Sequence, residues 1–257
     1  MLKYKKILLV SCLLLIIIIV ADYYYTVSTW WYIGIVIATV GLLAYGSISI
    51  RSDFYCRVIC AVDSGDKVIA LTFDDGPDEQ VTPQVLDLLN KHRVKAAFFC
   101  VGSRVLQHPA LVERMDKEGH IIGNHGFSHH FFFDLFSAGR IGEELVKTEK
   151  LVQRIVHKRL QLFRPPYGVT NPVLAKALRR TNYKSIGWSL KSKDTVIRDE
   201  QKLYERLTGK LGNAEIILLH DTCPHLVPAL DKFIAYAQEH EYRFERLDKL
   251  LQIEAYE

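Results

Sequence analysis

This chain has few cysteines and methionines, and its basic and acidic residues nearly balance. Its 257 residues include 5 cysteines and 2 methionines, and 33 basic against 29 acidic residues leave a net charge of +4. Only Cys56 and Cys60 are close in sequence, so nothing resembles the disulfide framework of small secreted domains. Such a small charge gives no case for nucleic acid as a partner. No internal repeat, low-complexity run or flexible linker is present.

Charged residues are also scarce in the first fifty positions. An apolar run from Ile7 to Ala21 and a second, uncharged run from Trp31 to Ile50 are separated by Asp22 and a cluster of aromatic residues. The first run is short against the ~20 residues of a usual span, but flanking tyrosines and lysine stems extend it. A cleaved signal peptide is the alternative. Because no small-x-small cleavage site follows and a second run comes at once, we predict two transmembrane helices.

The domain organisation follows from these runs. Residues 1–50 are predicted to form a membrane anchor, residues 51–66 a short connector, and residues 67–257 a globular domain held close to the bilayer, whose lipids are then a partner. Basic residues lie at the two outer ends of the hairpin (Lys3, Lys5, Lys6, Arg51 and Arg57), and its central connector has none. The positive-inside rule therefore favours a multi-pass membrane protein whose globular domain faces the cytoplasm. An extracellular domain is the alternative, if the first segment only lies in the interface.

The most informative motif is a strand that ends in two acids. An apolar run from Val68 to Phe73 is followed by Asp74 and Asp75 and then by a Gly-Pro turn. Adjacent residues on a strand point to opposite faces, so the turn must bring both acids towards one cleft. One could then bind a cation while the other acts as a base. The ordinary alternative is an Asp pair in a turn.

A histidine pair supplies further ligand atoms. His125 and His129 are four positions apart, which places both imidazoles on one face if the segment is a helical turn. Two imidazoles and one carboxylate form a set that suits catalytic zinc and leaves positions open for water and substrate. In isolation such a pair is more often a solvated surface feature.

Three later segments also carry polar groups at the end of an apolar stretch. Arg164 precedes Pro165 and Pro166, Asp194 follows the segment from Ser185 to Leu190, and His220 ends the run that starts at Ile216. Polar residues gathered at the C-terminal ends of barrel strands are typical of catalytic sites. Five such segments in one chain therefore predict an active site at one end of a sheet.

Strands alternate with amphipathic stretches after residue 66. This alternation predicts parallel strands with crossover helices, and so an α/β fold. Periodicity alone leaves an open doubly wound sheet as an alternative to a barrel. The expected strands are 68–73, 96–101 and 121–123, and the expected helices are 82–92, 109–118, 143–156 and 171–181.

These motifs resemble those of the polysaccharide deacetylase family, also called carbohydrate esterase family 4 or the NodB homology domain. The resemblance covers about residue 66 to the C-terminus, and it depends on Thr-Phe-Asp-Asp-Gly at 72–76, His-x-x-x-His at 125–129 and Arg-Pro-Pro-Tyr-Gly at 164–168. It implies an irregular (β/α) barrel and a hydrolase that removes N-acetyl groups from an N-acetylhexosamine-containing glycan such as peptidoglycan, a chitin-like oligomer or a lipid-linked glycan. It also implies a divalent metal ion, with zinc as our prediction.

The resemblance further implies a role for each site residue. Asp75, His125 and His129 would be the metal ligands, and Asp74 the catalytic base. The remaining roles concern the groups around that base: Arg164 would hold Asp74, the Tyr167 amide would help to bind the oxyanion, His220 would be the general acid oriented by Asp194, and Trp188 and Leu218 would wall the acetyl pocket. Metal-bound water, a preorganised oxyanion site and an acid near neutral pH are what amide hydrolysis needs.

One motif departs from the family pattern. Lys191 and Thr195 stand where the family often has an aspartate and a tryptophan. The departure alters the wall of the cleft and so concerns specificity more than chemistry. Two other functions remain open at this point: a catalytically inactive carbohydrate-binding membrane protein, and an O-acetyl or formyl hydrolase that uses the same metal site. A serine nucleophile is disfavoured, because neither Ser128 nor Thr72 has an evident base.

Overall fold

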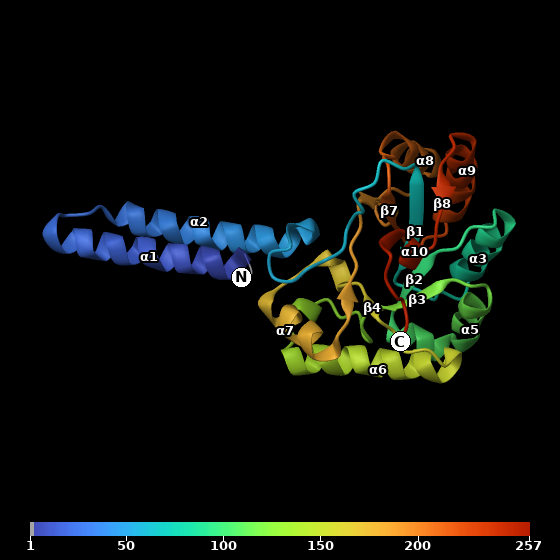
Figure 1. The fold of residues 1–257 in the computed structure, drawn as a ribbon, viewed down its shortest axis with the longest axis horizontal. Coiled ribbons are helices and arrows are strands. Elements are labelled where there is room, and N and C mark those ends of the chain that lie inside the picture. The colour runs from blue at the N-terminus through green and yellow to red at the C-terminus, as the bar shows by residue number, and fades with distance from the viewer. Residues whose placement is uncertain (1–2) are drawn as a thin grey trace.

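The computed structural model describes residues 3–257, which form a helical hairpin and an α/β domain (Figure 1). The hairpin consists of α1 (Lys3–Tyr24) and α2 (Thr29–Ile48), and both helices are long and apolar enough to cross a membrane. Nearly all their side chains are exposed, because the hairpin projects away from the domain. Both predicted apolar runs are therefore helical.

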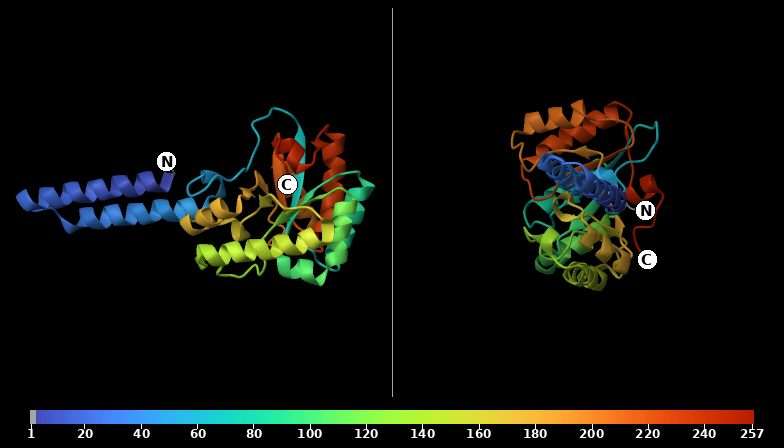
Figure 2. Two further views of the ribbon diagram at one scale, coloured as in Figure 1. Left: turned by 60° about the horizontal axis from the view of Figure 1, so that its bottom comes forward. Right: turned by 90° about the vertical axis from the view of Figure 1, so that its left-hand side faces the viewer.

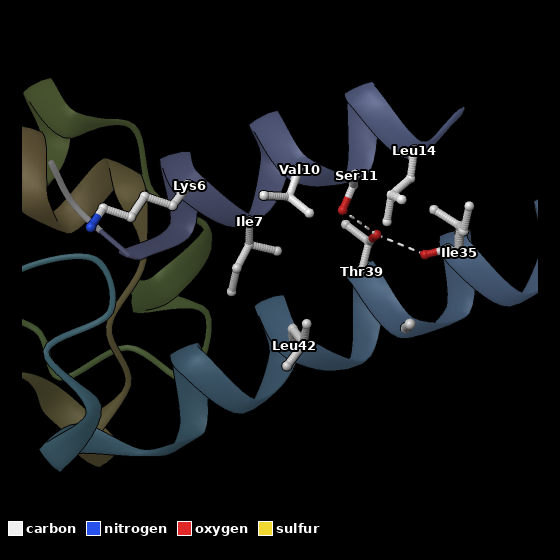
Figure 3. A pocket seen from close by; sticks show the side chains of 9 residues that line it. Lys6, Ile7, Val10, Ser11, Leu14, Ile35, Thr39 and Leu42 are labelled. Carbon is white, nitrogen blue, oxygen red and sulfur yellow. Dashed lines mark hydrogen bonds between the residues drawn. The ribbon is translucent and has the colours of Figure 1, made fainter. Parts of the chain in front are cut away.

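The two helices are joined by polar contacts on their facing sides. Figure 3 shows the hydroxyls of Ser11 and Thr39, 2.8 Å apart, with the Thr39 hydroxyl also donating to the Ile35 carbonyl at 2.7 Å. Ile7, Val10, Leu14 and Leu42 line the groove around them. Hydroxyls that satisfy each other between two apolar helices are the arrangement expected where no water is available.

The domain is built on a curled, parallel sheet of eight strands. Its order is β5-β4-β3-β2-β1-β7-β6, and β8 pairs with the start of β1. The strands are β1 (Val68–Asp74), β2 (Ala97–Cys100), β3 (Ile121–Asn124), β4 (Leu162–Phe163), β5 (Lys184–Ser185), β6 (Leu190–Lys191), β7 (Glu215–His220) and β8 (Arg243–Phe244). The end strands β5 and β6 do not pair, so the barrel is irregular, as predicted. The sheet is therefore curled but not closed.

Helices cover the outside of this sheet. They are α3 (Val81–Lys91), α4 (Gly102–Gln107), α5 (Pro109–Lys117), α6 (Ala138–Val156), α7 (Pro172–Thr181), α8 (Glu200–Gly209), α9 (Leu226–Glu239) and α10 (Leu247–Leu251). Every residue of the central strand β1 is buried, because β2 and β7 flank it and side chains pack on both of its faces. On one face Phe73 stacks on Phe98 with ring centroids 4.9 Å apart. The predicted helices match α3, α5, α6 and α7, whereas α4, α8, α9 and α10 were not predicted.

The segment between hairpin and sheet packs firmly on the domain. Ile50, Val58 and Cys60 are buried and form a small cluster beside Trp188. Gly187 allows this approach, since a Cβ at that position would lie 2.4 Å from the Cys60 sulfur. The end of α2 is also attached, because the Thr170 N–H donates to the Ser47 carbonyl at 3.1 Å. The hairpin therefore leaves the domain at a fixed point.

We expect the chain from residue 49 onwards to fold without the hairpin. Beyond the C-cap of the helix itself, four hydrogen bonds join later residues to α2: Thr170 N–H to Ser47, Thr170 Oγ1 to Gly46, Ser52 Oγ to Gly46, and the Tyr55 hydroxyl to Leu43. Their loss should lower the free energy of unfolding by about 2–6 kcal/mol, at ~0.5–1.5 kcal/mol for each net hydrogen bond. Gel filtration and chemical denaturation of the truncated protein measure this. Aggregation without a cooperative transition would show that α1 and α2 belong to the core.

Candidate active site

A cleft of about 280 Å³ lies at the C-terminal ends of the central strands. The side chains that line it come from every polar strand end singled out in the sequence: Asp74, Asp75, His125, His129, Tyr167, Gly168, Trp188, Lys191, Thr195, Leu218 and His220. Arg164 and Asp194 are fully buried directly behind it. The ten residues that the sequence analysis selected therefore lie together at one end of the sheet.

Asp74 and Asp75 reach the same cleft because the backbone is extended at Asp74 and left-handed at Asp75. Asp74 is the last residue of β1, and Asp75 has a φ of +74°. That left-handed conformation turns the Asp75 side chain out of the alternation of the strand. Beneath this turn, Gly76 has no room for a side chain, since a Cβ would lie 2.1 Å from a carboxylate oxygen of Asp221.

Asp75, His125 and His129 converge on one point. An oxygen of Asp75 lies 3.5 Å from Nε2 of His125 and 3.2 Å from Nε2 of His129. All three ligand atoms lie within 4.8 Å of one another, so they could hold a metal ion. Nδ1 of His125 is 2.8 Å from the Arg164 carbonyl, which fixes the proton on Nδ1 and turns the Nε2 lone pair towards the group.

The charge state of this group also suits a cation. Burial raises the pKa of Asp75, but the hydrogen bond to His125 and the neighbouring imidazoles outweigh burial, so the net shift is downward. The carboxylate is therefore ionised over the physiological pH range. One carboxylate and two imidazoles, of which that of His125 has a fixed tautomer, are a donor set that zinc accepts.

The expected helical turn between His125 and His129 is wrong. β3 ends at Asn124, and an irregular loop follows in which Gly126 has a φ of +79° and His129 a φ of +47°. One oxygen of Glu144 in α6 holds this loop by accepting from the Phe127 N–H at 2.9 Å and the Ser128 N–H at 2.7 Å. The imidazoles meet, with ring centroids 5.1 Å apart, because of this loop rather than a helix face.

Arg164 holds Asp74 from the rear of the cleft. The guanidinium has no exposure, and its Nη1 donates to Asp74 Oδ1 and to Thr72 Oγ1, both at 2.8 Å. Its other nitrogens donate to the carbonyls of Ile186 at 3.3 Å and Gly187 at 2.7 Å. The free oxygen of Asp74 lies 3.9 Å from Nε2 of His125, directly beside the group of possible metal ligands.

His220 faces Asp74 from the neighbouring strand β7 and is paired with a buried acid. Asp194 accepts from the His220 backbone N–H at 2.7 Å and lies 2.7 Å from the ring Nδ1. Burial lowers the pKa of His220, but the hydrogen bond and charge of Asp194 outweigh burial and raise this pKa to about 9. The imidazole is therefore protonated at neutral pH.

The mouth of the cleft is formed by Tyr167, Trp188 and Leu218. Tyr167 has a φ of +59°, and its N–H has no acceptor among the described residues, whereas the next N–H, of Gly168, donates to the Pro165 carbonyl at 3.0 Å. Gly168 lies flat against Trp188, where a Cβ would be 2.4 Å from the indole ring. The free Tyr167 N–H is thus available to a bound molecule.

The two residues that depart from the family pattern both line the cleft. Lys191 places its ammonium group 5.5 Å from the Trp188 ring centroid, and Thr195 lies beside it in the wall. An aspartate and a tryptophan are thereby replaced by a cation and a small hydroxyl.

Asp221 is a buried acid for which the sequence analysis assigned no role. Its carboxyl group accepts from the Thr82 hydroxyl at 2.6 Å beneath the Asp75–Gly76 turn. Burial raises its pKa to about 7. Its position next to His220 was visible in the sequence, but its contact with a turn some 145 positions earlier was not.

Comparisons with known proteins agree with this site. The family described as "Polysaccharide deacetylase" matches residues 61–186. A peptidoglycan-N-acetylglucosamine deacetylase of Bacillus cereus is 34% identical over 195 residues, which cover 74% of this chain and 91% of that protein. The peptidoglycan-N-acetylmuramic acid deacetylase PdaA of Bacillus subtilis is 36% identical over 190 residues, with 72% of each protein covered. A crystal structure of a peptidoglycan N-acetylglucosamine deacetylase superposes with a TM-score of 0.73 at 30% identity and covers 77% of this chain and 94% of that one.

The chain belongs to the polysaccharide deacetylase family. It is a polysaccharide deacetylase, a hydrolase of carbon–nitrogen bonds. The family, the fold class and the enzyme class predicted from the sequence are confirmed.

The pairing with Asp194 predicts an unusual titration of His220. Its imidazole should lose its proton near pH 9 rather than near the ordinary ~6.5. Because the folded-state pKa is raised, the stabilisation is complete below about pH 6.5 and is lost as the pH rises through about 9. Asp194→Asn should return the pKa towards ~6.5. Histidine NMR titration measures both, with the resonance identified by its loss in His220→Gln; a wild-type pKa near 6.5 would contradict the pairing.

Proposed function

We propose that the cleft binds one N-acetylated sugar unit with its acetyl group between Asp74 and His220. The observation that carries this proposal is the pairing on the two sides of the cleft. Asp74 is held by a buried arginine at 2.8 Å, and His220 is held by a buried aspartate at 2.7 Å. One side thus holds the base in place with a buried cation, and the other keeps the acid protonated with a buried carboxylate.

Asp75, His125 and His129 are proposed to hold the metal ion, and zinc fits this donor set best. When bound, the metal would lower the pKa of water and polarise a carbonyl. Asp74 takes the proton of the attacking water, and Arg164 keeps the Asp74 carboxylate in place while it does so. The other oxygen of Asp74 is directed towards His125, at 3.9 Å, so the base lies beside the metal ligands.

The remaining groups deal with the charge and the leaving amine. The Tyr167 N–H donates to the acetyl oxygen as negative charge develops on it. As the carbon–nitrogen bond breaks, His220 gives its proton to the departing sugar nitrogen, and acetate and a free amine are formed. Asp194 orients His220 and stabilises its protonated form. Trp188 and Leu218 enclose the acetyl methyl group.

Substitution of the base or of the acid should leave metal binding intact. Asp74→Asn and His220→Ala are expected to lower turnover of an N-acetylglucosamine oligomer by ~10²–10⁴-fold, the usual loss of general acid–base help. Both variants should keep their zinc by elemental analysis, whereas His125→Ala should lose it. Full activity in either of the first two variants would refute the role assignments. An O-acetylated oligomer measured in parallel tests the alternative that the site prefers esters.

The glycan itself is proposed from the relatives. Those compared above are named for peptidoglycan N-acetylglucosamine and N-acetylmuramic acid, so a peptidoglycan-type glycan is the proposed substrate. Lys191 in the cleft wall is then the residue that distinguishes this chain, because an ammonium group at the entrance favours an anionic substituent on the glycan. An inactive carbohydrate-binding role is disfavoured by the complete set of paired groups.

We also propose that residues 1–50 span the membrane as a hairpin, that residues 51–66 connect it to the domain, and that residues 67–257 face the cytoplasm. Lys3, Lys5, Lys6 and Arg51 lie at the end of the hairpin that joins the domain, and the opposite end has Asp22 and no basic residue. The substrate would then be a glycan still carried on a membrane lipid.

Fusions at the C-terminus test this orientation. A fluorescent protein that matures only in the cytoplasm should be bright when fused after Glu257, and a phosphatase that is active only outside should be silent. Insertion of the same reporters between Tyr25 and Ser28, at the tip of the hairpin, should give the reverse pattern. Phosphatase activity at the C-terminus would overturn the cytoplasmic orientation and favour the assembled wall polymer as substrate.

A further inference from the structure

The domain exposes an unusual group of apolar side chains beside the active site. Phe131, Phe132 and Leu135, here called the Phe loop, are 74%, 53% and 79% exposed. They occupy the loop that follows His129 and the short helix Phe133–Leu135. Three large apolar side chains held together in water are costly to expose, and such patches usually mark a surface of contact.

The Phe loop lies next to the point where the hairpin enters the domain. Asn171 donates its side-chain amide to the Asp134 carbonyl at 2.7 Å, within the loop. The preceding residue, Thr170, donates to the carbonyls of Ser47 at 3.1 Å and Gly46 at 3.3 Å, in the last turn of α2. α7, which begins after Asn171, lies on the hairpin side of the domain in both Figure 1 and Figure 2.

The length of α2 sets the depth of this point in the bilayer. Its 20 residues, at ~1.5 Å each, match the ~30 Å of hydrocarbon, so Gly46 and Ser47 come at the level of the lipid headgroups. The Phe loop is joined to this level through Thr170 and Asn171, which contact Ser47 and Asp134.

Basic side chains lie near the end of α2 that contains Gly46 and Ser47. Lys3 and Lys6 line a groove with Tyr45 and Phe54, and in Figure 3 Lys6 extends from the domain end of the hairpin groove. Arg179 of α7 lines another groove with Arg57. Cations at the headgroup level attract the anionic lipids of a membrane surface. Asp134 lies between Phe132 and Leu135. Burial raises the pKa of this carboxyl group and so favours its neutral form, which is less costly to bring to the lipid.

We propose that the Phe loop inserts into the headgroup boundary of the bilayer that holds the hairpin, and that the active site thereby opens against the membrane surface. The inference rests on the proposed spanning hairpin. Tyr167 links the two sites, because its ring centroid lies 6.3 Å from that of Phe131 and 4.8 Å from that of His129. A docked Phe loop therefore places the cleft within reach of a sugar carried on a membrane lipid.

Lipid contact is measured directly with a fluorophore on single cysteines in the full-length chain in phosphatidylglycerol nanodiscs. The background replaces the two accessible cysteines, Cys12 and Cys56, by alanine. Leu135→Cys reports on the Phe loop. Leu106→Cys is a matched control, since Leu106 is 60% exposed on α4, which runs into α5 on the far side of the domain (Figure 1). Ile37→Cys, in the middle of α2, reports on the hairpin.

We expect spin-labelled lipids to quench the probes at 135 and 37 but not the probe at 106. Quenching at 37 without quenching at 135 overturns the inference and leaves the anchor intact. No quenching at 37 refutes the spanning hairpin, and the inference falls with it. Deacetylation is not part of this readout, so failure of the catalytic proposal is separate.

A kinetic arm asks whether the Phe loop instead binds sugar. The triple variant with serine at 131, 132 and 135 should raise the KM for an N-acetylglucosaminyl lipid in nanodiscs by at least about tenfold, which corresponds to ~1.4 kcal/mol of lost contact. Its KM for a soluble N-acetylglucosamine oligomer should stay as in the wild type. An equal loss on both substrates would show a glycan-stacking surface and overturn the membrane inference.

Discussion

The buried guanidinium of Arg164 is the interaction on which the active site depends. It joins the end of β4 to the catalytic end of β1 through Thr72 and Asp74, and to the segment after β5 through two carbonyls. A fully buried cation is tolerated only when it is paired and its donors are satisfied. Among residues 3–257, Asp74 is the one carboxylate that pairs with this cation, so the base and the packing of three strands are interdependent. The guanidinium carbon of Arg164 lies 4.2 Å from the centroid of the Phe99 ring, and this stacking holds the guanidinium in place.

The adjacent acids Asp74 and Asp75 contact different partners. Asp74 ends a regular strand and is directed to the arginine, whereas the left-handed Asp75 is directed to the imidazoles. Asp221 supports this turn from below and leaves no room for a side chain at Gly76. Two residues with identical chemistry thus occupy different environments because one backbone angle changes between them.

Much of this arrangement could be predicted from the sequence, and what could not has physical reasons. Polar residues at the ends of apolar runs located the cleft, since parallel strands bring their C-terminal ends together. The loop between His125 and His129 was misassigned because Glu144, which holds it, lies far along the chain. Helices α8 and α9 were not predicted: α8 buries only Leu203 and Leu207, so its apolar stripe is short, and α9 has Pro228 in its first turn. The connector was predicted only to be short. Its burial depends on Gly187, whose lack of a side chain makes room for Cys60, and the sequence does not show that these two residues meet.

That connector also relates the anchor to the chemistry. Cys60 packs on Gly187, the Gly187 carbonyl accepts from Arg164, and Arg164 holds Asp74. Arg51, three residues after α2, donates to the carbonyl of Trp188 in the wall of the cleft. The position of the hairpin is therefore passed to the active site through packed side chains and hydrogen bonds rather than through a flexible tether. With the hairpin in a bilayer as proposed, a site placed so rigidly stays near the membrane surface, and its substrate comes to that surface.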